Sequence, residues 1–139
     1  DLTADPKAFP EQLKHTSVWQ PRRLFYNTSW FFFGSREAFD KADLNIIANL
    51  FAENATVEDP VGTPQHVGIE AIKAFYKSAF DMGVKLVIDG KPRCAGNSVA
   101  FNFHVVMPGM KISPIDVFEL NADGKVQSMK AYWSADNMG

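Results

Sequence analysis

Two aspartates stand among apolar residues in segments that lie far apart along the chain. Asp59 lies between Val57 and Val61, and Asp116 lies in the mostly apolar stretch 113–118. Two carboxyl groups in different surroundings can hold opposite protonation states at one pH. The pair therefore predicts an enzyme that moves a proton within an apolar, uncharged substrate.

Asp116 belongs to a predicted strand. Side chains alternate between the two faces of a strand, so Asp116 shares its face with apolar residues. A carboxylate there loses hydration, which favours the protonated form, and a neutral carboxyl group can donate a hydrogen bond to a developing oxyanion. The structural alternative is an aspartate that faces a loop or pairs with a buried donor. The apolar residues on its face are Ile112, Pro114, Phe118 and Leu120.

Asp59 follows a short predicted strand, and Pro60 favours an extended conformation at the residue before it. A carboxylate at the mouth of a pocket can stay ionised and accept a proton from carbon. The alternative is local, because an aspartate before a proline commonly starts a turn.

Aromatic and other apolar side chains on the later strands form a candidate slot for a flat hydrophobic ligand. Met129 and Trp133 share one strand face, and Phe101 and Phe103 share another. Such stripes also form ordinary protein cores, so both interpretations stay open. The predicted ligand-binding residues are Val61, Phe101, Phe103, Phe118, Met129 and Trp133.

The composition argues against several other functions. A net charge of -2 provides no basic surface for nucleic acid or for an anionic membrane, and no apolar run is long enough to span a bilayer. Cys94 is the single cysteine, which excludes an internal disulfide. His15, His66 and His104 have no metal-ligand spacing with one another or with that cysteine. We expect a cytoplasmic protein.

The 139 residues fit one domain, which we place at residues 28–139 behind an irregular, proline-punctuated arm at residues 1–27. Helical spacing predicts a first helix near 22–41. Asp43 is predicted to cap a second helix, whose apolar stripe reaches Phe51. A third helix is predicted to begin after Gly68 and to end near Gly83.

Strand patterns dominate the rest of the chain. They cover 56–58, 85–89, 92–95, 98–107, 110–121 and 125–133, with turn signals at 108–109 and 123–124. Helices followed by a meander predict an α+β fold. We expect a cone-like, curved antiparallel or mixed sheet with about three helices on its concave face, and a conical pocket between the two layers.

Four segments carry a family resemblance. Residues 50–62 closely resemble the base-bearing segment of bacterial Δ5-3-ketosteroid isomerases, and residues 68–76 resemble the helix that follows it. Residues 113–116 match the segment with the protonated acid of that family, and residues 124–133 match its last strand. The family shares a cone fold with nuclear transport factor 2 and scytalone dehydratase, so the resemblance implies that fold here.

The resemblance also implies a mechanism. Asp59 would remove a proton from the carbon between a ketone and a double bond, and would return it to the far end of the conjugated system. Neutral Asp116 would donate a hydrogen bond to the oxygen of the dienolate. No cofactor or metal is implied, because the ketone already acidifies the carbon. The expected partners are a steroid-like hydrophobic ligand and a second copy of the chain, paired through the outer face of the sheet.

One position departs from the family. Its main oxyanion donor is a tyrosine on the first helix, and an ungapped count places Ser35 there. A serine is too short to reach the same oxygen but can hold a bridging water. Tyr76 matches a tyrosine that supports this donor, and Tyr26 could replace it only if the helix were shifted. The predicted catalytic residues are Asp59, Asp116, Tyr76 and Ser35. The departure keeps a second function open: a protein of this fold that binds, dehydrates or cyclises another hydrophobic molecule.

Overall fold

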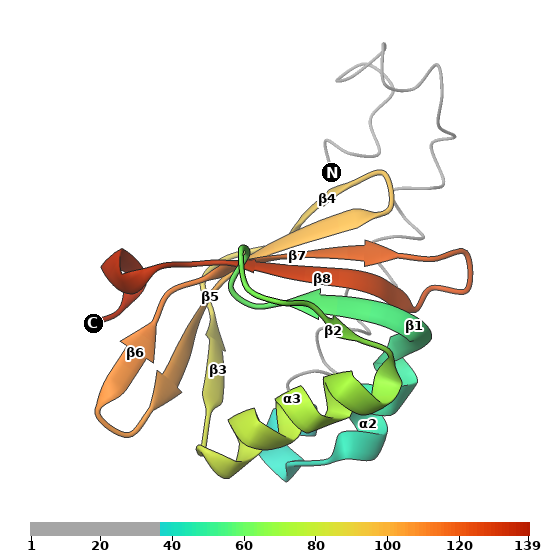
Figure 1. Ribbon diagram of the computed structural model, residues 1–139. Coiled ribbons are helices and arrows are strands. Elements are labelled where there is room, and N and C mark those ends of the chain that lie inside the picture. Colours follow the sequence, from blue (N-terminus) through green and yellow to red (C-terminus); the bar gives the residue numbers. More distant parts are fainter. Residues whose placement is uncertain (1–36) are drawn as a thin grey trace, which may run out of the picture.

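A curved sheet dominates residues 37–139, the part of the chain that this computed structural model describes (Figure 1). Its strands are β1 (Phe51–Glu58), β2 (His66–Val67), β3 (Lys85–Ile88), β4 (Arg93–Ala95), β5 (Ser98–Met107), β6 (Met110–Ile112), β7 (Ile115–Leu120) and β8 (Val126–Tyr132). Their main path runs β2-β1-β8-β7-β5-β3, and both β4 and β6 also pair with β5. The central β1–β8 pair is parallel, whereas the other described pairs are antiparallel.

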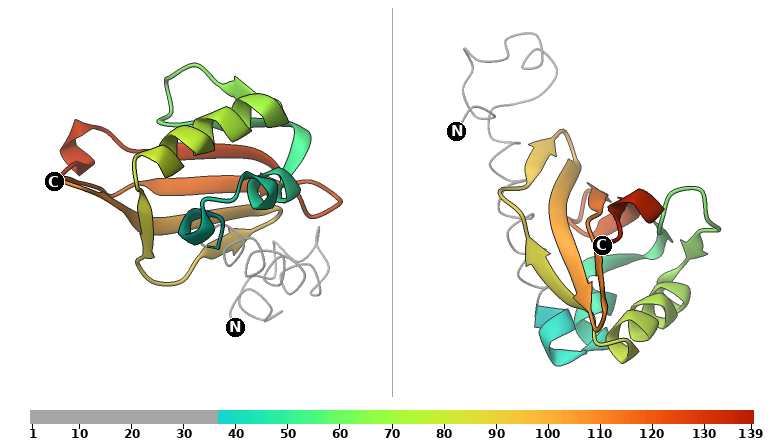
Figure 2. Two further views of the ribbon diagram at one scale, coloured as in Figure 1. Left: turned by 90° about the horizontal axis from the view of Figure 1, so that it is seen from below. Right: turned by 90° about the vertical axis from the view of Figure 1, so that its left-hand side faces the viewer.

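The helices lie on the side toward which the sheet curls (Figure 2). They are a helical stretch at residues 37–41, α2 (Leu44–Leu50) and α3 (Ile69–Asp81), and a short 3-10 helix, η3 (Ala135–Asn137), follows β8. The predicted fold class, a curved mixed sheet with helices against its concave face, is therefore confirmed. No helix of residues 37–139 combines the length and the apolar character needed to cross a membrane. The predicted arm at 1–27, Tyr26 and Ser35 lie outside the described residues.

The boundary between α2 and β1 differs from the prediction. Asp43 caps α2 as expected, and its Oδ1 accepts a hydrogen bond of 2.9 Å from the backbone N–H of Asn45. The helix ends at Leu50, however, and the strand already begins at Phe51 instead of residue 56. Phe51 continues the apolar spacing of the helix, but it is buried as the first residue of the strand. The same apolar residue fits both patterns, so the spacing placed the end of the helix too late.

The long strand predicted at 110–121 is divided into β6 and β7. The break falls at Ser113 and Pro114, since a proline has no N–H to donate to a strand ladder. On either side of the break the predicted alternation is confirmed: Ile112, Asp116 and Phe118 are buried on one face. This alternation points the only buried acid of the described core toward the concave side of the sheet.

On the outer face, His104 of β5 ties three segments together. Its Nε2 lies 3.0 Å from Asp89 Oδ2, after β3, and its Nδ1 lies 3.1 Å from Ser113 Oγ, before β7. The side chain of His104 is 28% exposed, and these contacts give the histidine a structural pairing role on the strand. Its neighbours along β5, Phe103 and Val105, point the opposite way into a cavity.

Candidate active site

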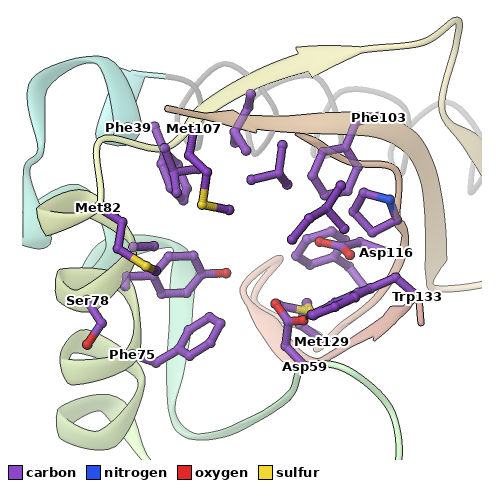
Figure 3. Close-up of a pocket in the computed structure, with 18 residues that line it drawn as sticks. Phe39, Asp59, Phe75, Ser78, Met82, Phe103, Met107, Asp116, Met129 and Trp133 are labelled. Carbon is purple, nitrogen blue, oxygen red and sulfur yellow. The ribbon is translucent and has the colours of Figure 1, made fainter. Parts of the chain in front are cut away.

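A cavity of about 310 Å³ lies between α3 and the concave face of the sheet (Figure 3). This volume is at the lower end of the range of about 300 to 1,000 Å³ that small-molecule pockets occupy. Its wall comes from α3, from the helical stretch before α2 and from five strands and their flanking loops. The lining residues are Phe39, Asp59, Phe75, Tyr76, Ser78, Ala79, Met82, Val84, Leu86, Phe103, Val105, Met107, Ile112, Pro114, Asp116, Phe118, Met129 and Trp133.

The polar groups of this wall are few and unevenly placed. Figure 3 shows the carboxyl groups of Asp59 and Asp116 at one end of the cavity, beside Trp133, whereas Met82 lies toward the other end. Among the described lining residues none is basic. The cavity therefore suits an uncharged, mainly apolar ligand whose reacting part meets two acids.

Asp59 lies in the loop that follows β1, and two hydrogen bonds fix its position. The backbone N–H of Val61 donates a hydrogen bond of 2.8 Å to the carbonyl oxygen of Ala131, which fastens the loop to β8. The indole N–H of Trp133 donates a hydrogen bond of 2.6 Å to Asp59 Oδ1. Partial burial raises the pKa of Asp59, and the Trp133 bond and the nearby His66 oppose that rise. One carboxylate oxygen is thus fixed, and the acid keeps support for its ionised form.

Asp116 has a different environment. Its side chain comes from β7, the residue is only 8% exposed, and Oδ1 has no hydrogen-bond partner within residues 37–139. Burial, and secondarily the charge of Asp59, raise the pKa of Asp116 well above its ordinary value of 3.8. This carboxyl group therefore keeps its proton at pH values where an exposed aspartate is ionised, and it can act as a hydrogen-bond donor.

Tyr76 of α3 is the third polar group in this cavity that could act on a ligand. Its ring is wedged among aromatic side chains, with edge-to-face contacts to Phe39 at 5.8 Å and Phe75 at 5.2 Å between centroids. Burial raises the pKa of Tyr76 well above 10.0, and the charges of Asp116 and Asp59 add to the effect. The phenol thus keeps its proton, and it forms no hydrogen bond with another described residue.

The structure brings most of the predicted site residues together. Seven of the ten line the cavity, and their roles in binding or catalysis remain predictions. Ser35 lies outside the described residues. These seven are Asp59, Tyr76, Phe103, Asp116, Phe118, Met129 and Trp133.

Two predicted ligand-binding residues, Val61 and Phe101, do not line this cavity. Val61 is 42% exposed, because the loop after Asp59 turns it toward solvent. Phe101 is buried, but it packs edge-to-face against Phe118 at 5.4 Å between centroids and lies outside the cavity wall. It shares a strand face with Phe103, so alternation identified the correct face but not how far the cavity extends along β5.

Sequence reasoning missed the wall that α3 provides. Phe75, Ala79 and Met82 follow one another at helical spacing and all line the cavity. That spacing was a usable signal, because residues three and four apart share a helix face. The hydrogen bond between Trp133 and Asp59 was also not predicted. No local sequence pattern indicates it, because 74 positions separate the two residues.

The described residues offer no cluster of three or more histidine, cysteine or acidic side chains that could hold a metal ion. The fold and the cavity together define a cone-shaped protein of the nuclear transport factor 2-like class, with a cavity that suits a small hydrophobic ligand. Residues 34–129 match the SnoaL-like domain, so the chain belongs to the SnoaL-like family.

Two similar proteins indicate which types of reaction this family catalyses. A protein of Nocardioides simplex named Steroid Delta-isomerase is 36% identical over 96 residues, which cover 66% of this chain and 77% of that protein. A solved structure of SalBIII, an epoxide hydrolase/cyclase-like enzyme in pyran ring formation in polyether salinomycin, superposes with a TM-score of 0.75. It is 28% identical, and the match covers 86% of this chain and 96% of SalBIII. The family and these relatives support an isomerase- or cyclase-type activity.

Proposed function

We propose that this protein is a cofactor-independent isomerase of β,γ-unsaturated 3-ketosteroids, which moves the double bond into conjugation through a dienolate. The observation that carries the proposal is the contrast between two acids in one apolar cavity. Asp59 has a donor on Oδ1 that supports its charge, whereas Asp116 is buried with no described partner for Oδ1. Such a pair supplies a base and a proton-bearing donor at the same pH.

The proposed reaction has two proton transfers. The carboxylate of Asp59 takes a proton from the carbon between the ketone and the double bond, and the electron pair moves to the ketone oxygen. Asp116 donates a hydrogen bond to that oxygen as it becomes negative. Asp59 then returns the proton to the far carbon of the dienolate, and the ketone re-forms in conjugation with the displaced double bond.

Tyr76 is the proposed second donor to the oxyanion. Its phenol lines the cavity, and the raised pKa of Tyr76 keeps its proton in place. This role would compensate for Ser35, at the position where ketosteroid isomerases have a tyrosine; Ser35 could contribute through a bound water. One oxyanion donor typically contributes about a hundred- to thousandfold in rate.

A second candidate function is dehydration or cyclisation of another hydrophobic molecule. The similarity to SalBIII over 86% of the chain favours it, and a neutral acid beside a carboxylate can also protonate a leaving hydroxyl group. Simple ligand binding explains the two acids less well, because a binding protein has no chemical need for a carboxylate in an apolar cavity, where a charge is costly.

The test is turnover of a Δ5-3-ketosteroid, followed by the absorbance of the conjugated enone. We expect activity in the parent, a collapse in Asp59→Asn and little change in Asp89→Asn, a matched loss of charge on the outer face. Tight steroid binding without turnover in the parent would favour the second function. Absence of both binding and turnover would overturn the steroid assignment.

We further propose that the protein is a homodimer that pairs through the outer face of the sheet. Sedimentation at micromolar concentration should give twice the chain mass of 15.5 kDa, and Ile115→Lys should shift the equilibrium toward the monomer. A monomer at all concentrations would contradict this. Apolar residues exposed on that face are Val87, Val106, Ile115 and Tyr132.

A further inference from the structure

His66 is a histidine beside the cavity that the proposed chemistry does not use. In β2 it pairs with Val57 of β1 in an antiparallel register. Directly opposed residues of such a pair point to the same side of the sheet. Val57 is fully buried, and Asp59, two positions further, lines the cavity. The three side chains therefore share the inner face, with His66 diagonally adjacent to Asp59.

The imidazole ring is held in this place from both sides. It packs on the ring of Phe75, a cavity residue of α3, with 4.8 Å between centroids and 38° between planes. The backbone N–H of Gly68 donates a hydrogen bond of 2.8 Å to the carbonyl oxygen of Ala55, which fixes the end of β2 against β1. Neither ring nitrogen of His66 is hydrogen-bonded to another residue of the described chain. The ring is thus placed by packing, and no residue of 37–139 occupies its hydrogen-bonding nitrogens.

Other charges near His66 are paired or turned away. Glu58 accepts hydrogen bonds from the backbone of Gly62 and the side chain of Gln65, and it faces away from the cavity. On α3, Glu70 lies 3.6 Å from Lys73, and the carboxylate side of that pair is largely exposed.

The groups that face the same cavity are uncharged donors or acids. Tyr76 and Asp116 both have a pKa well above the ordinary value and keep their protons. Among the described residues, the charge that lowers the pKa of Asp59 is that of His66. The larger influence in that direction, the Trp133 hydrogen bond, comes from a group that does not titrate.

We propose that His66 is a positioning residue for the proton transfer: its imidazolium, packed on Phe75 beside the cavity, stabilises the charged form of Asp59. A histidine gains its proton in mildly acidic solution. This arrangement keeps the base ionised to lower pH than burial alone would allow. The inference rests on the proposed role of Asp59 as the base.

The test is a titration of the Asp59 carboxyl group by carbon NMR in the full chain without substrate. Two neutral variants remove the charge differently: His66→Gln removes the ring, and His66→Phe keeps a ring against Phe75. Both should raise the titration midpoint of Asp59, and His66→Arg should restore it. His104→Gln, the same change on the outer face, is the matched control and should leave the midpoint unchanged.

An unchanged midpoint in both neutral variants would overturn the proposal. An equal rise in His66→Phe, His66→Gln and His66→Arg would also overturn it, because packing and not charge would then be responsible. If one neutral variant does not fold, the other decides. The titration needs no turnover, so it stays decisive even if the steroid assignment fails. In an active enzyme the acid limb of kcat/KM should move with the midpoint, with about tenfold lower activity on the acid side per unit of displacement.

Discussion

Trp133 donates its indole N–H to Asp59 Oδ1 over 2.6 Å, across 74 positions of sequence. The bond joins the end of β8 to the loop after β1, and it leaves the second oxygen of the carboxylate available to a ligand. A hydrogen bond to a charged group contributes about 1.5 to 3 kcal/mol. The contact therefore fixes the geometry of the proposed base and also favours its ionised form.

Trp133→Phe should remove this bond while keeping an aromatic ring in the wall. The pKa of Asp59 should rise, because the bond opposes the effect of burial. We expect kcat/KM for the ketosteroid to fall by about tenfold or more, and its acid limb to move to higher pH. A pH profile of kcat/KM measures both effects. Tyr132→Phe on the outer face is the control, and an unshifted acid limb in Trp133→Phe would argue against the role.

Asp116 gives a prediction about stability. Because the pKa of Asp116 is raised in the folded state, the folded chain binds the proton of this carboxyl group more tightly than the unfolded chain does. This contribution to stability is complete below the ordinary value of 3.8 and is lost as the pH rises through the raised value. Urea denaturation across that range should show the loss in the parent and a flatter pH dependence in Asp116→Asn. A parallel dependence in both proteins would show that the acid is ionised in the fold.

The same residue gives a prediction about catalysis. Asp116→Ala removes the proposed donor to the oxyanion and should lower kcat for the ketosteroid by about a hundred- to thousandfold. Asp116→Asn keeps an uncharged donor and should retain much more activity. Steady-state kinetics of the two variants distinguishes them, and equal losses would mean that hydrogen-bond donation is not what the residue supplies.

Tyr76→Phe tests the proposed second donor. The ring stays in its aromatic setting against Phe39 and Phe75, so the fold should be retained. Removing the hydroxyl group should lower kcat by up to about a hundred- to thousandfold and change KM little, since the interaction strengthens only in the dienolate-like state. An unchanged kcat would move the donor role to Ser35 or to a bound water.

Packing beneath the cavity gives a prediction that is independent of function. Ile72 of α3 is fully buried in the core. Ile72→Ala should lower the free energy of unfolding by about 2 to 5 kcal/mol, through lost burial and the space left behind. Lys77→Ala on the exposed side of the same helix should change it by less than about 0.5 kcal/mol. Urea denaturation compares the two, and similar losses would contradict the described core.

The sequence was informative wherever a local pattern decides the structure. The alternation around Asp116 identified its buried face, and Asp43 marked the start of a helix through a side-chain cap. The boundary between α2 and β1 at Phe51 was not predicted, because an apolar residue can extend a helical stripe and can also begin a buried strand.

Contacts between distant segments could not be predicted for a different reason. Strand alternation assigns a face, but the length of the cavity depends on where α3 crosses the sheet, which left Phe101 outside the wall. The contacts of Trp133 and His66 with the region of Asp59 depend on the β1–β8 and β1–β2 pairings. Such pairings between distant segments have no signature in a single short window of sequence.

The wall that encloses the ligand space holds two acids and, among its described members, no cation. A carboxylated or phosphorylated lipid of suitable size would have to surrender its hydration without receiving a counter-ion, which is strongly unfavourable. Neutral metabolites avoid that penalty. The lining of the cavity therefore disfavours anionic hydrophobic molecules, whatever their shape.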